Sequence, residues 1–321
     1  MEPTLVSTQF EAALRAVEAE DASPQEKAEM LMEIAMGMQQ RPKSVAQLQQ
    51  AVNLYERALS TCPADAPLLR ARVQARMGTA LQSLPDDGSH PLRRALQCYE
   101  QALPVLTSFG RPEECAEVEM NIGLVLQSTP GRLVEALSHY HAALRTFTRE
   151  QYPQEFAILH NNLAIAYLSI PLSDERGKMR EALAVQSFEE VLKVINLVDH
   201  PGEYAMIQNN LGNALQYAAS GHALENNLRA LAAYDEALKV RNRRDTPLEF
   251  ANTIANKANV LRNLPEGLEA PELFQGSPLA GARALYEEAR DIFQEHRQQG
   301  SAELVAEALA DLTQQQAAAV V

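Results

Sequence analysis

Tryptophan is missing from the 321 residues of this protein, and cysteine occurs only three times. The cysteines are Cys62, Cys98 and Cys115, and no two of them form a CxxC pair. An odd number of widely spaced cysteines favours neither a disulfide framework nor a zinc site. We expect them to be small buried hydrophobic residues, with no metal and no cofactor attached.

Positive charge is also scarce, because 28 Lys and Arg face 42 Asp and Glu, which gives a net charge of −14. A nucleic-acid partner needs a basic stripe that neutralises phosphates, so this class is excluded. No window is long and apolar enough to span a bilayer, and the N-terminus lacks the basic start and apolar run of a signal peptide. A cytoplasmic protein with no membrane partner is expected, and 46% hydrophobic residues suffice for a large core.

Motifs that mark common active sites are missing as well. The sequence contains no HExxH, no Gly-rich phosphate loop and no GxSxG. His139 and His141 are two residues apart, on different sides of a helix, which makes them poor co-ligands for a metal. The basic run 239–245 closes a helix, where cations offset the negative end of the dipole, and this role is favoured over phosphate binding. The sequence therefore favours a protein that is not an enzyme.

Internal repeats are the strongest signal in the sequence. One motif consists of Ala, an aromatic residue four positions later, and a small or apolar residue three positions after that. Spacings of four and three place the three side chains on one stripe of a helix, so we expect each copy to form the second helix of a pair. The six copies are Ala51/Tyr55/Ala58, Ala95/Tyr99/Ala102, Ala136/Tyr140/Ala143, Ala184/Phe188/Val191, Ala230/Tyr234/Ala237 and Ala282/Tyr286/Ala289.

A different motif precedes each of these helices. It is Pro-x-x-x-Ala, in most copies with Glu two residues after the Pro. Pro suits the first helical position, and Glu stabilises the positive end of the helix dipole, so the motif predicts where a first helix begins. The copies begin at Pro24, Pro67, Pro112, Pro153, Pro201 and Pro247. Seven residues after each Ala is a small residue, expected to allow close helix packing: Ala35, Gly78, Gly123, Ala164, Gly212 and Ala258.

At these residues the sequence resembles the tetratricopeptide repeat (TPR) family. The likeness is carried by the large-small pairs Leu163-Ala164 and Leu211-Gly212 and by the Ala/Tyr/Ala second helices. It covers residues 24–298, although the period exceeds the basic unit of about 34 residues and the family's tryptophan is missing. The long period is most similar to kinesin-light-chain repeats and to the bacterial arrays that accompany CHAT domains.

The resemblance implies an all-α protein, a right-handed α-solenoid of about six helix-turn-helix units with capping helices. Residues 1–23 are predicted to form an N-terminal capping helix, and 299–321 a C-terminal capping helix with a frayed tail. The connection 264–278 is either a functional loop or a disordered insertion. The predicted units span 24–62, 67–108, 112–149, 153–198, 201–243 and 247–298.

The family's groove-facing positions predict a concave surface that binds peptides. Met side chains suit irregular apolar contacts, whereas amides donate and accept, which suits the backbone of an extended peptide. The predicted groove residues are Met32, Met36, Met120 and Leu124 in the N-terminal half, and Asn161, Ile165, Asn209, Asn213, Gln216, Asn252, Asn259 and Arg262 in the C-terminal half.

Two alternatives stay open for this surface. The Met side chains belong either to the groove or to a core beneath the leading helix. A second file of Asn side chains, one residue further round, either contacts a ligand or ties one first helix to the next. These residues are Asn121, Asn162, Asn210 and Asn256.

The predicted function is a non-enzymatic protein-protein interaction scaffold that binds a peptide segment or a partner subunit, as an adaptor or complex-assembly factor. The alternative is an effector- or peptide-responsive regulatory TPR protein. The basic carboxylate clamp of chaperone-binding members of the family is not expected here, because its positions carry other residues. The identity of the partner and the oligomeric state stay open.

Overall fold

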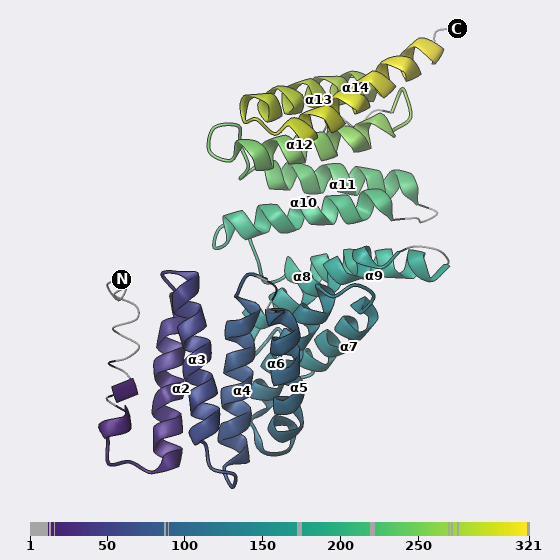
Figure 1. Ribbon diagram of the computed structural model, residues 1–321. Helices are drawn as coiled ribbons and strands as arrows, with labels where there is room; N and C mark the ends of the chain where they lie inside the picture. Colours follow the sequence, from purple (N-terminus) through teal and green to yellow (C-terminus); the bar gives the residue numbers. More distant parts are fainter. Residues whose placement is uncertain are drawn as a thin grey trace. The chain divides into compact units, whose positions relative to one another are not determined.

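Every regular element in the computed structural model is an α-helix, for the part of the chain that it describes (Figure 1). The described residues are 12–319, apart from 13, 16, 87, 89, 172–174, 219–221, 269, 271 and 275. They divide into two compact units, Met1–Gln151 and Tyr152–Val321. The predicted all-α class and the packing in successive helix pairs are confirmed.

The first unit contains three helix pairs that pack in chain order. The helices of each pair contact one another, and α3 and α5 each also contact the first helix of the next pair. The pairs are α2 (Pro24–Gln40) with α3 (Val45–Thr61), α4 (Pro67–Gln82) with α5 (Pro91–Phe109), and α6 (Pro112–Gln127) with α7 (Leu133–Ala143).

The second unit repeats this arrangement and adds one more helix. Second helices again contact the first helix of the next pair, and α14 packs on α13. The pairs are α8 (Pro153–Ser169) with α9 (Glu175–Val191), α10 (Pro201–Tyr217) with α11 (Ala223–Leu238), and α12 (Pro247–Arg262) with α13 (Pro278–Glu295), followed by α14 (Gln299–Ala319).

The first helices begin where the sequence predicts. All six start at the Pro of the Pro-x-x-x-Ala motif. At α2 the start is reinforced by a capping box, in which the Ser23 hydroxyl accepts from the Glu26 amide at 3.3 Å and the Glu26 carboxylate accepts from the Ser23 amide at 2.8 Å. These bonds satisfy amide groups that the first helical turn leaves unpaired.

The aromatic residues of the second helices form the centre of each pair. All six, from Tyr55 to Tyr286, are at most 1% exposed. Where the first helix carries glycine, the ring occupies the space that a side chain would need. A Cβ atom added at Gly78 would lie 2.7 Å from Cε1 of Tyr99, and one added at Gly212 would lie 2.5 Å from Cε1 of Tyr234. The predicted close packing at the small residues is confirmed.

Both ends of the array carry additional helical residues. Residues 1–11, including Phe10, lie outside the described part, but residues 17–19 are helical and Val17 is 3% exposed. Glu18 pairs with Arg57 of α3 at 3.0 Å. At the other end α14 runs to Ala319, and residues 320–321 lie outside the described part.

Two further sequence expectations concern a loop and the membrane. In the connection 264–278, Leu264 and Ala270 are buried and the Ser277 hydroxyl caps α13, whereas Pro265, Glu266 and Gly267 are exposed. Whether the loop has a function stays a prediction. Among the described residues, no helix combines the length and the apolar character needed to cross a bilayer.

Candidate interaction surface

One candidate surface lies along the first helices of the first unit. A hollow of about 130 Å³ is lined by residues from α2, α4 and α6, and we call it the N-terminal groove. Met32 and Met36 line it from α2, and both are partly exposed. Met120 and Leu124 are partly exposed on α6 but do not line this hollow. Three consecutive first helices therefore meet at a surface with apolar side chains at one edge.

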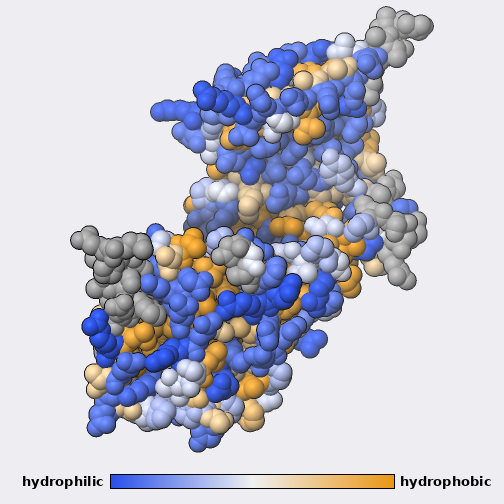
Figure 2. All heavy atoms as spheres, in the orientation of Figure 1, coloured by the Kyte–Doolittle hydropathy of each residue, from blue (hydrophilic) through white to orange (hydrophobic). Residues whose placement is uncertain are grey.

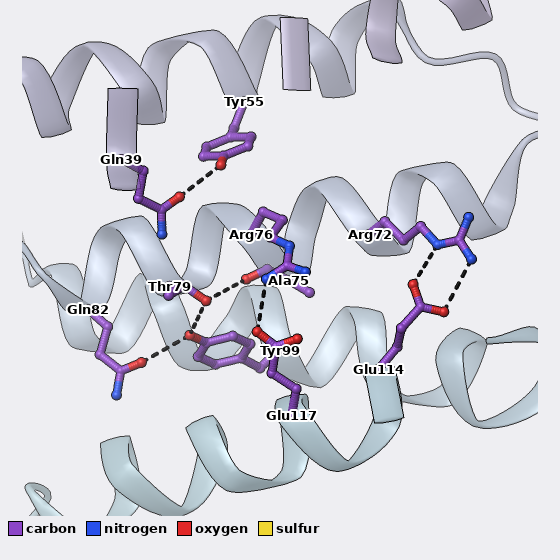
Figure 3. A network of polar contacts seen from close by, with 10 residues as sticks. All are labelled: Gln39, Tyr55, Arg72, Ala75, Arg76, Thr79, Gln82, Tyr99, Glu114 and Glu117. Atoms are coloured by element: carbon purple, nitrogen blue, oxygen red, sulfur yellow. Dashed lines mark hydrogen bonds and ion pairs between the residues drawn. The ribbon is translucent and has the colours of Figure 1, made fainter. Parts of the chain in front are cut away.

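Two ion pairs cross the N-terminal groove between α4 and α6 (Figure 3). Arg72 holds Glu114 through two bonds, Nε to Oε1 at 2.7 Å and Nη2 to Oε2 at 3.1 Å. One turn along, Nη1 of Arg76 lies 2.8 Å from Oε1 of Glu117. The hydrogen bond from Arg72 lowers the pKa of Glu114 below its ordinary value of 4.5. These charges both fix the groove wall and give it polar character.

The sequence reasoning missed these charged residues. Arg72 and Glu117 each directly follow the Ala of a Pro-x-x-x-Ala motif, a position that the family pattern assigns to the groove. The repeat register therefore contained the signal for their location. Their partners, however, come from a neighbouring repeat and become apparent only when α4 and α6 are placed side by side.

A second polar network links the two helices in five of the six pairs. The hydroxyl of the second-helix Tyr donates to a side-chain amide oxygen of the first helix, part of which is drawn in Figure 3. A buried hydroxyl needs such a partner, because leaving it unpaired is costly. The bonds are Tyr55 to Gln39 (2.8 Å), Tyr99 to Gln82 (2.9 Å), Tyr140 to Gln127 (2.6 Å), Tyr234 to Asn213 (2.7 Å) and Tyr286 to Asn259 (2.5 Å).

Several predicted groove residues belong to this network. Asn213 and Asn259 accept from the buried tyrosines, and Gln216 is a second acceptor for Tyr234 at 3.3 Å. Arg262 lies 3.8 Å from Asp311 of α14. The structure thus gives each of these side chains an intramolecular partner, and their role in binding stays a prediction.

In the fourth pair, the second helix has no tyrosine hydroxyl and the first helix has no amide acceptor for one. Its second helix carries Phe188 in place of Tyr, and the corresponding first-helix positions hold Ile165 and Leu168, which cannot accept a hydrogen bond. Phe188 is 1% exposed, so the ring still fills the core. This correlation can be read from the sequence alone, and it predicts that the Gln and Asn side chains accept hydrogen bonds from the tyrosines.

The Asn residues of the second unit differ in their environments. Asn209 on α10 is 8% exposed, and its Oδ1 accepts from Nδ2 of Asn256 on α12 at 3.4 Å. Asn252 is exposed. Asn161 is partly buried, and its Oδ1 has no hydrogen-bond partner in the part of the chain that the structure describes. Asn256 belongs to the second file of Asn side chains, and it links the two first helices α10 and α12. This agrees with one of the two alternatives that the sequence left open.

Asn161 faces a second hollow, which we call the C-terminal pocket. Its volume is about 400 Å³, and its walls come from α8, the end of α9 with the turn that follows, and α10. Ile158 and Met206 line it and are 48% and 41% exposed. Hydrophobic residues are also visible at the surface over α8 and α9 in Figure 2.

The remaining candidates have ordinary structural partners. Arg241 in the basic run donates to Thr253 at 2.8 Å, and Arg243 pairs with Glu295 at 2.9 Å. Cys62 and Cys98 are buried as expected, whereas Cys115 is partly exposed, and burial raises the pKa of Cys98 to about 11. No cluster of metal-ligating side chains occurs among the described residues.

Comparisons with known proteins point to helical-repeat proteins. The family model for soluble NSF attachment protein (SNAP) matches residues 87–235. The structure of BtubC (BKLC) from P. vanneervenii is similar, with a TM-score of 0.51 and 21% sequence identity, over 74% of this chain and 91% of that chain. A Rap protein complexed with competence and sporulation factor aligns over 96% of this chain and 80% of its own, but a TM-score of 0.40 and 12% identity are too low to bear on the fold. No curated protein matches the chain.

The fold follows from several observations together. Successive helix pairs, second-helix aromatic residues packed on small first-helix residues, and the similarity to BtubC agree with one another. The resemblance seen in the repeated motifs is thereby confirmed. This chain is a helical-repeat protein with a TPR-like fold.

Proposed function

We propose that this protein is a non-enzymatic interaction scaffold that binds a peptide segment or partner subunit along the surface of its first helices. The observation that carries the proposal is the N-terminal groove, where partly exposed Met32 and Met36 lie beside the charged side chains of Arg76 and Glu117. Adjacent apolar and charged groups are typical of surfaces that bind polypeptides, because they combine apolar burial with orienting polar contacts.

The SNAP match supports a role in protein association. SNAP is, by its name, an attachment protein for another protein, NSF. TPR-like arrays use stacked helix pairs to present an extended surface, to which a peptide can bind at several successive repeats. We therefore assign the protein an adaptor or assembly role, with a polypeptide as its ligand.

A tiled peptide array probed with the full chain tests this proposal. We expect a subset of peptides to bind the parent, and we expect Met32→Asp to lose these signals because a charge replaces an apolar contact. The matched control is Val134→Asp, which places the same charge at a 64% exposed apolar position on second helix α7 of the same unit. Met32→Asp should retain the parent's melting temperature and helical content.

Two results would count against the proposal. One is an array with no binding peptides above background. The other is equal loss of signal from Met32→Asp and Val134→Asp, which would show that the negative charge acts non-specifically. A lower melting temperature for Met32→Asp alone would place Met32 in the core, and the groove would then have to be dropped as the binding site.

A further inference from the structure

The C-terminal pocket contains two buried polar atoms that lack hydrogen-bond partners among the described residues. Oδ1 of Asn161 lies on α8, and Nδ1 of His200 belongs to the residue that precedes α10. Both residues line the pocket. Buried polar groups in proteins are nearly always hydrogen-bonded, so two such atoms at one hollow make it a candidate site for a ligand that supplies the missing bonds.

The side-chain oxygen of Asn161 differs in its hydrogen bonding from that of the equivalent Asn in the next repeat. Asn209 occupies the same repeat position as Asn161, and its Oδ1 is occupied by Asn256. The residue equivalent to Asn256 for Asn161 is Asn210, but no hydrogen bond reaches Oδ1 of Asn161. Asn210 of the next repeat therefore leaves Oδ1 of Asn161 available to a ligand.

The walls of the pocket are apolar. Ile158 and Met206 are 48% and 41% exposed at its rim, whereas Ile195 and Ile207 lie deeper and are buried. Large apolar side chains that are exposed beside a hollow are stabilised when a partner covers them. A volume of about 400 Å³ accommodates a Leu or Phe side chain together with part of the main chain.

The charge at the rim limits what can bind. Glu203 lines the pocket, is exposed, and forms no ion pair with a described residue. The described residues that line the pocket include no Lys and no Arg. A carboxylate ligand would therefore meet Glu203 with no side-chain cation beside it, whereas a cationic group is attracted both by Glu203 and by the net charge of −14.

We propose that the C-terminal pocket is an anchor subsite for an extended peptide with a large apolar residue and a Lys or Arg two positions later. This inference rests on the proposed function and specifies which residues of the peptide bind at the C-terminal pocket. The apolar side chain enters between Ile158 and Met206, and a main-chain N–H donates to Oδ1 of Asn161. His200, in the tautomer with hydrogen on Nδ1, donates to a main-chain carbonyl. In an extended segment, side chains two positions apart share a face, so the cation meets Glu203.

A panel of defined peptides tests the proposal on the full chain. The probes are acetylated and amidated Gly-Ser-Gly-X-Gly-Z-Ser-Gly, with Leu, Phe or Ala at X and Lys or Glu at Z. Methionine methyl groups carry ¹³C, so that Met206 reports on this pocket and Met32 on the N-terminal groove, each resonance being identified from its Leu variant. We expect the Met206 resonance to move with Leu or Phe at X and Lys at Z, with affinity about tenfold above that of the Ala or Glu peptides.

Two pairs of variants separate the polar contacts from general effects. Asn161→Ala should weaken binding of the Leu/Lys peptide about tenfold, whereas Asn53→Ala, which removes an exposed amide from second helix α3, should leave it unchanged. Glu203→Lys should reverse the preference, so that the peptide with Glu at Z binds better than the one with Lys. Glu249→Lys makes the same change at the equivalent exposed position of α12 and should not alter the preference.

The outcomes distinguish this inference from the proposed function. If peptides move the Met32 resonance but not that of Met206, the scaffold function holds and the anchor subsite is wrong. If no peptide of the panel moves Met206, or if Ala at X binds as well as Leu, the anchor subsite is also wrong, whatever the peptide array shows. Unchanged preference in Glu203→Lys would refute the basic residue in the ligand.

Discussion

At the scale of single residues, one contact recurs through the molecule. A second-helix tyrosine packs its ring on a small first-helix residue, and its hydroxyl donates to a side-chain amide oxygen of that first helix. The ring contributes apolar burial, and the hydroxyl fixes the rotation of one helix relative to the other. Gly78, Gly123 and Gly212 therefore leave the space that the ring takes, and all three have ordinary helical backbone.

The first prediction concerns this space. Gly212→Ala should destabilise the protein by about 1 to 3 kcal/mol, because the new Cβ would overlap the Tyr234 ring, even though Ala is the better helix former. Gly37→Ala is the matched control, since Gly37 is exposed within α2 and nothing lies within 4 Å of its added Cβ. That variant should gain up to about 1 kcal/mol. Urea unfolding of both variants measures the difference, and a Gly212→Ala protein as stable as the parent would refute the contact.

The second prediction concerns the hydroxyl. Phe188→Tyr should cost about 1 to 2 kcal/mol, because the new hydroxyl would face Ile165 and Leu168 and find no acceptor. Adding Leu168→Gln recreates the Tyr/Gln combination of the other pairs and should restore part of the loss. A double-mutant cycle from chemical unfolding measures this coupling. Additive effects of the two substitutions would mean that position 168 does not face ring 188.

At the scale of helices, the first helices are joined by polar contacts as well as by packing. Arg72 and Arg76 connect α4 to α6, and Asn256 connects α12 to α10. Arg72 and Arg76 line the N-terminal groove, so a ligand that binds there would meet a wall whose spacing is set by their ion pairs. Asn209 and Asn256 are not among the described residues that line the C-terminal pocket.

The third prediction follows from the lowered pKa of Glu114. The pair stabilises the fold fully above the ordinary carboxyl pKa of 4.5, and this contribution is lost as the pH falls through the lowered folded value. Arg72→Met should therefore lose about 1 kcal/mol at pH 7, a modest amount because Arg72 is 40% exposed and solvent screens it. The difference from the parent should shrink at lower pH, below the folded pKa.

Urea unfolding at several pH values checks this prediction. Arg149→Met is the control, since its pair with Glu150 is exposed on both sides, and we expect a change within about 0.5 kcal/mol at every pH. A deficit for Arg72→Met that stays constant from pH 7 through the acidic limb would show that the loss comes from packing of the arginine stem.

At the scale of the whole molecule, stacked pairs leave an apolar face at the end of the array. In the second unit this face is covered by α14, which packs on α13 and buries Val305, Leu309 and Leu312. The exposed positions of α14 include Glu303, Glu307 and Asp311, the small residues Ala306 and Ala310, and Leu304, which is 69% exposed. That α14 acts as a capping helix stays a prediction, which its packing on α13 supports.

The fourth prediction tests the cap with two leucines of the same helix. Leu312 is 0% exposed, so Leu312→Ala should cost about 2 to 4 kcal/mol through lost burial and the cavity left behind. Leu304→Ala should change stability by no more than about 0.5 kcal/mol. Thermal unfolding compares them, and size-exclusion chromatography should show no association for either. Equal effects of the two substitutions would mean that α14 does not bury the face that contains Leu312.

Much of the fold was determined locally and was therefore predictable from sequence. The first helices begin at Pro24, Pro153 and their equivalents because the preference of Pro for the first turn depends only on neighbouring residues. The aromatic core positions were predictable because a period of four and three defines one helix face whatever packs on it. The match between Phe188 and the apolar positions of its first helix was also in the sequence, although it was not used to assign the acceptors.

The tertiary structure alone decided which polar side chains form hydrogen bonds within the protein. Asn161, Asn209 and Asn213 are chemically identical and follow the same groove pattern, but one has an unpaired oxygen, one accepts from the next repeat, and one accepts from the tyrosine of its own pair. Likewise Arg72 finds Glu114 at a sequence separation of 42 residues. A hydrogen bond requires a separation near 3 Å and a defined direction. Such distances between helices arise from the packing of whole side chains, and local sequence preferences do not specify them.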